Sequence, residues 1–150
     1  WLDAWFESVP LAGAPDGFIY AHDLGDTDQS ASPETMLASY LTSSVFELGN
    51  GNAFMLSSRL IPDVSFGSST SATPGVEFSI EKRNFPGSAF VDGPLYPVEQ
   101  GVSVPVDQYT GKVDRRFRAR SVQIGITATE TGTFWQLGVP RIYAQPDGLR

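Results

Sequence analysis

The alternation of apolar and polar residues in Lys112–Gln145, together with the densest aromatic and β-branched content of the chain, predicts three successive β segments. The first part separates apolar residues and arginines by parity: Val113, Phe117 and Ala119 on one side, and Arg116, Arg118 and Arg120 on the other. Successive side chains of a β-strand point to opposite faces. This part of the chain is therefore predicted to form a strand with one buried face and one guanidinium face.

The parity of the apolar positions changes after Arg120. The next apolar residues are Val122, Ile124 and Ile126, with Gln123, Gly125 and Thr127 between them. Because a one-residue slip exchanges the two faces of a strand, we expect a bulge or a bend into another sheet near Arg120–Ser121. A turn at 130–132 then predicts a returning strand over 133–139, with Trp135, Leu137 and Val139 on one face. This hairpin is predicted to be the centre of the architecture.

The rest of the chain contains shorter β segments separated by turn residues. Strands are predicted at 18–20, 53–60, 76–81 and 102–106, and Pro105 limits the last one to a sheet edge. Residues 33–46 fit two structures: the sequence Ser-Pro-Glu at 32–34 is typical of a helix start, whereas 40–46 is rich in strand formers. We favour a strand over 38–47.

These strands and turns together predict an all-β fold. The expected architecture is an antiparallel β-sandwich, immunoglobulin-like or jelly-roll-like, with little or no helix. Residues 1–35 are interpreted as the end of a preceding β domain or a linker, and residues 36–150 as the sandwich domain. The first residue is Trp and no signal-peptide pattern follows it, so we expect the C-terminal portion of a longer chain.

Composition narrows the classes of function. The 150 residues contain no cysteine, which excludes disulfides and thiolate metal sites. The net charge of −7 is opposite to that expected of a general nucleic-acid binder. The sequence has no apolar run near the roughly 18 to 20 residues that span a bilayer, so no membrane partner is predicted.

Catalytic and metal-binding chemistry has little support in the sequence. His22 is the sole histidine, and we favour a surface role for it. Three carboxylates cluster nearby without the spacing of a calcium loop, so a solvated loop is the favoured interpretation: Asp23, Asp26 and Asp28. A glycosidase needs two carboxylates in one cleft, and pairs such as Glu77 and Glu81 are expected by chance among 17 acids. We therefore predict no catalytic residue, no cofactor and no metal site, and a protein that is not an enzyme.

The densest positive charge is the cluster Arg115, Arg116, Arg118 and Arg120. Such a cluster can bind phosphates or carboxylates, or it can form a solvated face paired with acids such as Glu77, Glu81 or Asp114. Because the chain as a whole is acidic, we favour pairing within the molecule or between subunits over contact with nucleic acid. The four arginines are thus candidates for a protein interface.

Two aromatic residues are candidates for stacking on sugars: Trp135 and Tyr143. A tryptophan in the middle of an alternating strand is more often part of the core, which we favour for Trp135.

A series of short segments resembles one protein family. In order, these segments are Phe46–Met55, Arg59–Phe66, Lys82–Gly87, Pro97–Gln100 (or Pro105–Tyr109), Arg118–Gln123, Trp135–Gly138, Pro140–Ile142 and Gln145–Arg150. Together, over residues 38–150, they resemble the C-terminal part of the packaged-DNA stabilisation, or tail nozzle, proteins of short-tailed bacteriophages. Ala119 stands where that family's pattern has glycine, and the chain is much shorter than the whole family protein.

The resemblance implies a structural virion protein of the phage tail without enzymatic activity. It implies a homo-oligomeric ring, six-fold in symmetry, that retains packaged DNA and forms the exit channel. The implied partners are the portal adaptor, tail fibre or spike proteins, and passing genomic DNA bound without sequence specificity. Residues 1–35 would then end a propeller-like domain. The alternative function is a carbohydrate-binding or receptor-binding fibre-like domain that uses Trp135 or Trp5.

Overall fold

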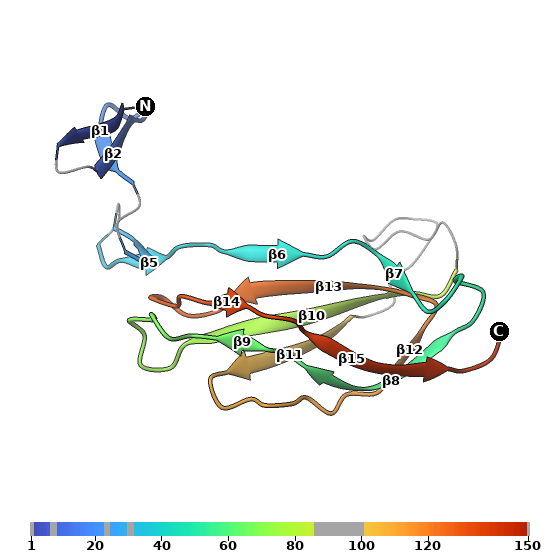
Figure 1. Ribbon diagram of the computed structural model, residues 1–150. Helices are drawn as coiled ribbons and strands as arrows, with labels where there is room; N and C mark the ends of the chain where they lie inside the picture. Colours follow the sequence, from blue (N-terminus) through green and yellow to red (C-terminus); the bar gives the residue numbers. More distant parts are fainter. Residues whose placement is uncertain (1, 7–8, 23–24, 30–31, 86–100, 150) are drawn as a thin grey trace.

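The computed structural model describes residues 2–6, 9–22, 25–29, 32–85 and 101–149. Throughout these residues the regular structure is β-strand, with no helix, and every strand pair is antiparallel (Figure 1). The predicted all-β, antiparallel fold class is therefore confirmed, and the arrangement of sheets is consistent with a β-sandwich. The choice between immunoglobulin-like and jelly-roll-like topology stays a prediction.

The strands form two principal sheets. The larger has the order β11 (Val102–Asp107), β10 (Gly75–Arg83), β13 (Ser121–Ala128) and β6 (Tyr40–Thr42), and β7 (Phe46–Glu47) also pairs with β13. The smaller has the order β12 (Phe117–Ala119), β8 (Met55–Ile61) and β15 (Arg141–Pro146). As Pro105 predicts, β11 is an edge strand.

Three small sheets complete the described structure. They are β1 (Leu2–Phe6), β2 (Val9–Gly13) and β3 (Ile19–Ala21); β4 (Thr27–Asp28) with β5 (Thr35–Met36); and β9 (Val64–Ser65) with β14 (Gln136–Leu137). The division of the chain near residue 35 stays a prediction.

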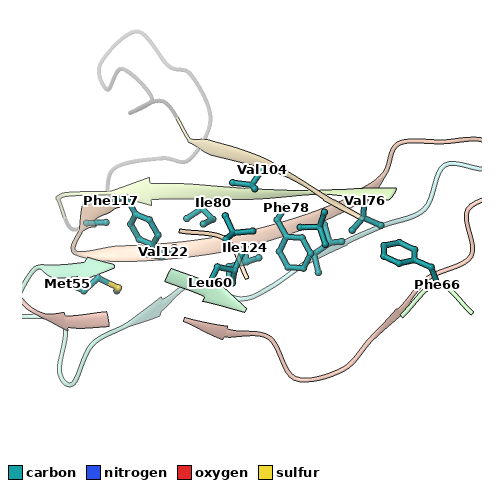
Figure 2. Packing of buried hydrophobic residues seen from close by; sticks show 14 residues of the cluster. Met55, Leu60, Phe66, Val76, Phe78, Ile80, Val104, Phe117, Val122 and Ile124 are labelled. Carbon is teal, nitrogen blue, oxygen red and sulfur yellow. The ribbon is translucent and has the colours of Figure 1, made fainter. Parts of the chain in front are cut away.

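The hydrophobic core lies between the two principal sheets. Figure 2 shows side chains of β10 and β13 pointing toward those of β8, and Phe78 and Leu60 are 0% and 2% exposed. The alternation predicted for residues 76–81 is observed, since Val76, Phe78 and Ile80 are all buried. Removing a buried phenylalanine side chain typically costs about 3–5 kcal/mol, so Phe78 contributes strongly to stability.

The change of parity near Arg120 marks a passage from one sheet to the other. β12 belongs to the smaller sheet and β13 to the larger, with Arg120 between them. Phe117 and Ala119 are buried before this point, and Val122 is buried after it. The two sheets face each other across the core, so the face that points toward the core in one sheet points away from it in the other. The buried residues therefore change parity where the chain crosses between the sheets. The predicted bend into another sheet is confirmed.

The arginine-bearing strand is shorter than predicted. Its regular part is β12, and Val113 makes an isolated bridge with Leu60, while residues 114–116 lie outside any strand. Four residue steps separate Val113 from Phe117, but three separate their partners Leu60 and Ser57. The extra residue cannot pair, so this stretch leaves the sheet.

The predicted hairpin between 121–128 and 133–139 is wrong. β13 pairs with β10, β6 and β7, whereas the returning segment pairs with β9. Trp135 and Leu137 do pack against the core, but Val139 is 65% exposed. The amide of Val139 donates to the Asp63 carboxylate at 2.6 Å, so the strand ends before it.

Residues 33–46 contain no helix. They form an extended run in which β5, β6 and β7 are short strands, and the last two pair with β13. The strand favoured over 38–47 is thus confirmed in type but divided into two pieces.

Candidate interaction surface on the three-stranded sheet

Strand register brings arginines from distant parts of the sequence to the smaller sheet. In this sheet Arg118 of β12 is opposite Leu56 of β8, which is opposite Gln145 of β15. Further along, Arg59 is opposite Tyr143, and Arg141 is opposite Ile61. Arg59 and Arg141 were not predicted from the sequence, because each is an isolated arginine in its own strand. The register alone places them beside the predicted cluster.

Arg118 is held by contacts within the molecule. Its guanidinium carbon lies 3.9 Å from the centre of the Phe54 ring. Its Nε donates to the Asp147 carboxylate at 2.6 Å and its Nη2 to the Asp147 carbonyl at 2.9 Å. Backbone hydrogen bonds join Phe54 to Asp147 and Gly148 at 2.8 and 2.9 Å. Arg118 therefore connects the C-terminal segment to Phe54, the residue directly before β8.

Arg120 lies at the crossing between the sheets and is half-buried. Its backbone amide donates to the Arg83 carbonyl at 3.1 Å, and its guanidinium carbon lies 5.1 Å from the centre of the Phe54 ring. Its buried Nε has no hydrogen-bond partner among the residues that the structure describes. This position favours contacts of the Arg120 side chain within the molecule over contacts with an external partner.

Arg115 and Arg116 differ from the other two members of the predicted cluster. Both are exposed in the segment that leaves the sheet edge, and neither forms an ion pair with any described residue. Of the acids considered as partners, Glu77 lies on β10 in the other sheet, where its carboxylate accepts from the Ser103 hydroxyl. Arg115 and Arg116 are thus open to an external partner.

Asp114, the carboxylate next to these two arginines, is already paired. It lies 2.8 Å from Arg59 Nε and 3.2 Å from Lys112 Nζ. The hydrogen bond from Arg59, followed by that from Lys112, holds the Asp114 pKa below its usual value. The same pairing raises the pKa of Arg59. All three side chains are exposed, so this is a solvated ion-pair network of modest strength.

Six basic side chains belong to the smaller sheet or to the segment leading into it. We name these residues the basic face: Arg59, Lys112, Arg115, Arg116, Arg118 and Arg141. Two carboxylates, Asp114 and Asp147, pair with members of this set. Positive charge therefore exceeds negative charge locally, although the whole chain is acidic.

The two aromatic candidates lie in different places. Trp135 packs against the core, donates from Nε1 to Ser39 Oγ at 2.9 Å, and lines a shallow hollow with Asp26 and Leu37. Tyr143 is 53% exposed on β15 and lines a separate hollow. The guanidinium carbon of Arg59 lies 5.8 Å from the centre of the Tyr143 ring. The two rings do not form one binding platform.

The remaining candidate groups show no catalytic arrangement among the described residues. The backbone amide of His22 donates to the Pro10 carbonyl at 2.8 Å. Asp23 lies outside the described residues, and the part of the chain that is described has no group of three or more possible metal ligands. Glu77 and Glu81 share the outward-pointing parity of β10, opposite to the buried parity.

No helix long and apolar enough to cross a membrane occurs in the ranges that the structure describes. Comparison of the chain with protein-family models, with curated proteins and with solved structures found no match.

Proposed function

We propose that this chain is a structural module of a short-tailed phage nozzle, located in the virion tail and acting through subunit and tail-protein contacts. The ordered series of segments over residues 38–150 that resembles the nozzle family is the observation that carries the proposal. Within that proposal the protein is not an enzyme. Its partners are further copies in a ring, the portal adaptor, and fibre or spike proteins.

The contacts among the resembling segments support treating them as one unit. Phe54, Arg118 and Asp147 come from three different segments of the series, and they form a single cluster. The distance between these segments along the sequence is large, but each stabilises the position of the others. The resemblance therefore concerns residues that depend on one another in the fold.

The outer face of the larger sheet suits a wall along which DNA passes. Glu77, Glu81 and Asp107 have the parity opposite to the buried residues of β10 and β11, and Arg83 is the one cation of that parity on these two strands, so the acids are in excess. Negative charge repels the phosphate backbone and would not retain a moving genome. In the proposed nozzle this face is the better candidate for the channel side, and the basic face for contact with protein.

The experiment that tests the proposal examines the full-length protein and the virion together. Mass photometry should find a closed oligomer, and electron microscopy of the virion should place this chain in the short tail below the portal. A protein that remains monomeric and is absent from virions would rule the proposal out.

A glycan-binding role is the second candidate, favoured by the exposed ring of Tyr143 beside Arg59. Exposed tyrosines present a flat apolar surface together with a polar tip, which suits sugar stacking.

A further inference from the structure

Charge is unevenly divided along the chain. Residues 1–35 contain seven acidic residues and neither lysine nor arginine, whereas residues 36–150 contain ten acidic and ten basic residues. The N-terminal segment thus accounts for the whole net charge of −7. A neutral domain with a basic face is joined to a strongly acidic segment.

The start of the N-terminal segment lies away from β12, the strand that carries Arg118. Figure 1 shows the sheet formed by β1, β2 and β3 beyond one end of the sandwich, while β12 and the C-terminus lie at the other end. Among the described residues, β1–β3 pair with no strand of the two principal sheets. The part of the acidic segment that contains β2 and β3 is therefore better placed to reach the basic face of another molecule than β12 of its own.

We propose that the acidic N-terminal segment, described over residues 9–22, 25–29 and 32–35, docks on the basic face of a second copy of the chain. The inference rests on the proposed function, since it names the contact by which copies join in the ring. Such a contact uses two different surfaces of each copy. It is therefore head-to-tail, and repeated contacts of this kind close into a ring when the rotation between copies permits.

Arg115 and Arg116 are the side chains best suited to this contact. Both are exposed and lack ion pairs with described residues, so they can bind carboxylates without breaking an existing pair. Guanidinium groups match carboxylates in a bidentate geometry. Arg59 and Arg118 remain paired with Asp114 and Asp147, so they add to the local positive potential and preserve the fold.

The acidic segment offers the exposed carboxylates of Asp16 and Glu34 and the half-buried carboxylate of Asp26. Asp16 accepts hydrogen bonds from the Phe18 amide at 3.0 Å and the Tyr20 hydroxyl at 2.7 Å, which orient it in its turn. Asp26 directly precedes β4 and lines the hollow beside Trp135, and Glu34 directly precedes β5. Glu34 accepts from the Thr27 hydroxyl at 2.7 Å. These groups form a surface that is complementary in charge to the basic face.

The test exchanges charges between the two surfaces in the full-length protein. One variant carries Arg115→Glu and Arg116→Glu, and the other carries Asp26→Lys and Glu34→Lys. Like charges across a contact disfavour it, so each variant alone should associate at least about tenfold more weakly than the natural chain in sedimentation velocity. An equimolar mixture should regain assembly, because each altered surface then meets an oppositely charged one. A chain with all four substitutions should also assemble, which shows that the substitutions are compatible with folding.

A matched control carries Glu81→Lys and Glu130→Lys, which changes net charge by the same amount as the acidic-segment variant. It should assemble like the natural chain. Raising salt from about 0.05 to 0.5 M should weaken the natural assembly, because screening acts over about 10 Å at 0.1 M.

Four outcomes would overturn the inference: a monomeric natural chain, normal assembly of either single-surface variant, failure of the mixture to assemble, or an equal effect of the control. If the natural chain forms a ring in virions while the charge exchanges have no effect, the nozzle proposal survives and this contact does not. If the basic-face variant loses binding to a DNA oligonucleotide but assembles normally, the face binds nucleic acid instead.

Discussion

The guanidinium group of Arg118 covers the ring of Phe54, with 3.9 Å between the guanidinium carbon and the ring centre. Phe54 is 6% exposed, so the arginine closes one edge of the core against water. Because Arg118 also binds Asp147 through both its carboxylate and its carbonyl, one side chain joins β8, β12 and the end of β15. This arrangement stabilises the fold and leaves other arginines for external contacts.

Replacing Arg118 by alanine should destabilise the protein by about 1–2 kcal/mol, since it removes a cation–π contact and an ion pair. Arg116→Ala is the matched control, because Arg116 is exposed and unpaired among the described residues. It should change stability by less than about 0.5 kcal/mol. Urea denaturation followed by tryptophan fluorescence measures both. Equal effects of the two substitutions would contradict a structural role for Arg118.

Gly132 occupies a backbone conformation that favours glycine, with φ of 73°. Its carbonyl accepts from the amides of Thr70 and Ser71 at 3.0 Å each, and an added Cβ would meet the Thr70 hydroxyl. Gly132→Ala should therefore cost about 1–3 kcal/mol, of which about 1–2 kcal/mol is the left-handed backbone penalty. Gly111→Ala is the control, because nothing lies within 4 Å of its added Cβ. Thermal unfolding compares the two, and a Gly132→Ala variant as stable as the control would refute this account of the turn.

Features set by local alternation could be predicted from the sequence, and features set by long-range pairing could not. The change of parity at Arg120 indicated the passage between sheets, because side-chain alternation is a property of neighbouring residues. The turn after β13 suggested a hairpin, but the following segment pairs with β9. A turn in the sequence predicts that the chain reverses direction, but it does not specify the strand with which the next segment pairs.

Only part of the candidate surface could be predicted, because local sequence patterns do not specify long-range pairing. The arginine cluster is visible in the sequence, and pairing with carboxylates was the favoured interpretation. Asp147, which pairs with Arg118, comes from a segment that was not considered as a partner. The contribution of Arg59 and Arg141 depends on the register of β8 with β15, which no local pattern specifies.

The ion pairs of Asp114 should make stability depend on pH in the acid range. The Arg59 and Lys112 contacts lower the pKa of Asp114 in the folded state. Their stabilising effect is therefore fully present above the unfolded pKa of about 3.9 and is lost as pH falls through the lower folded pKa. Asp114→Asn should lower the melting temperature slightly at pH 7 and have no effect at a pH well below the folded pKa. Glu130→Gln is the control, because Glu130 forms no ion pair among the described residues. A pH-independent effect of Asp114→Asn would show that the ion pairs do not contribute.

Tyr143 provides the sharper test of the glycan-binding candidate, because Trp135 also has a structural role. Trp135 packs against the core and donates to Ser39, so Trp135→Ala should destabilise the protein and reduce any binding indirectly. Tyr143 is 53% exposed, and Tyr143→Ala should leave the melting temperature within a few degrees of the natural value.

A glycan array probed with the natural chain and Tyr143→Ala therefore separates the two proposals. If the protein acts through subunit contacts, neither chain should bind glycans, and both should assemble equally well. If the natural chain binds glycans and a folded Tyr143→Ala variant does not, the glycan role is established. Glycan binding then becomes the better supported function of this face, in place of the nozzle proposal. Trp135→Phe is the companion variant, since it keeps an aromatic ring but loses the indole donor to Ser39. It should lose about 0.5–1.5 kcal/mol of stability, the usual net contribution of one hydrogen bond.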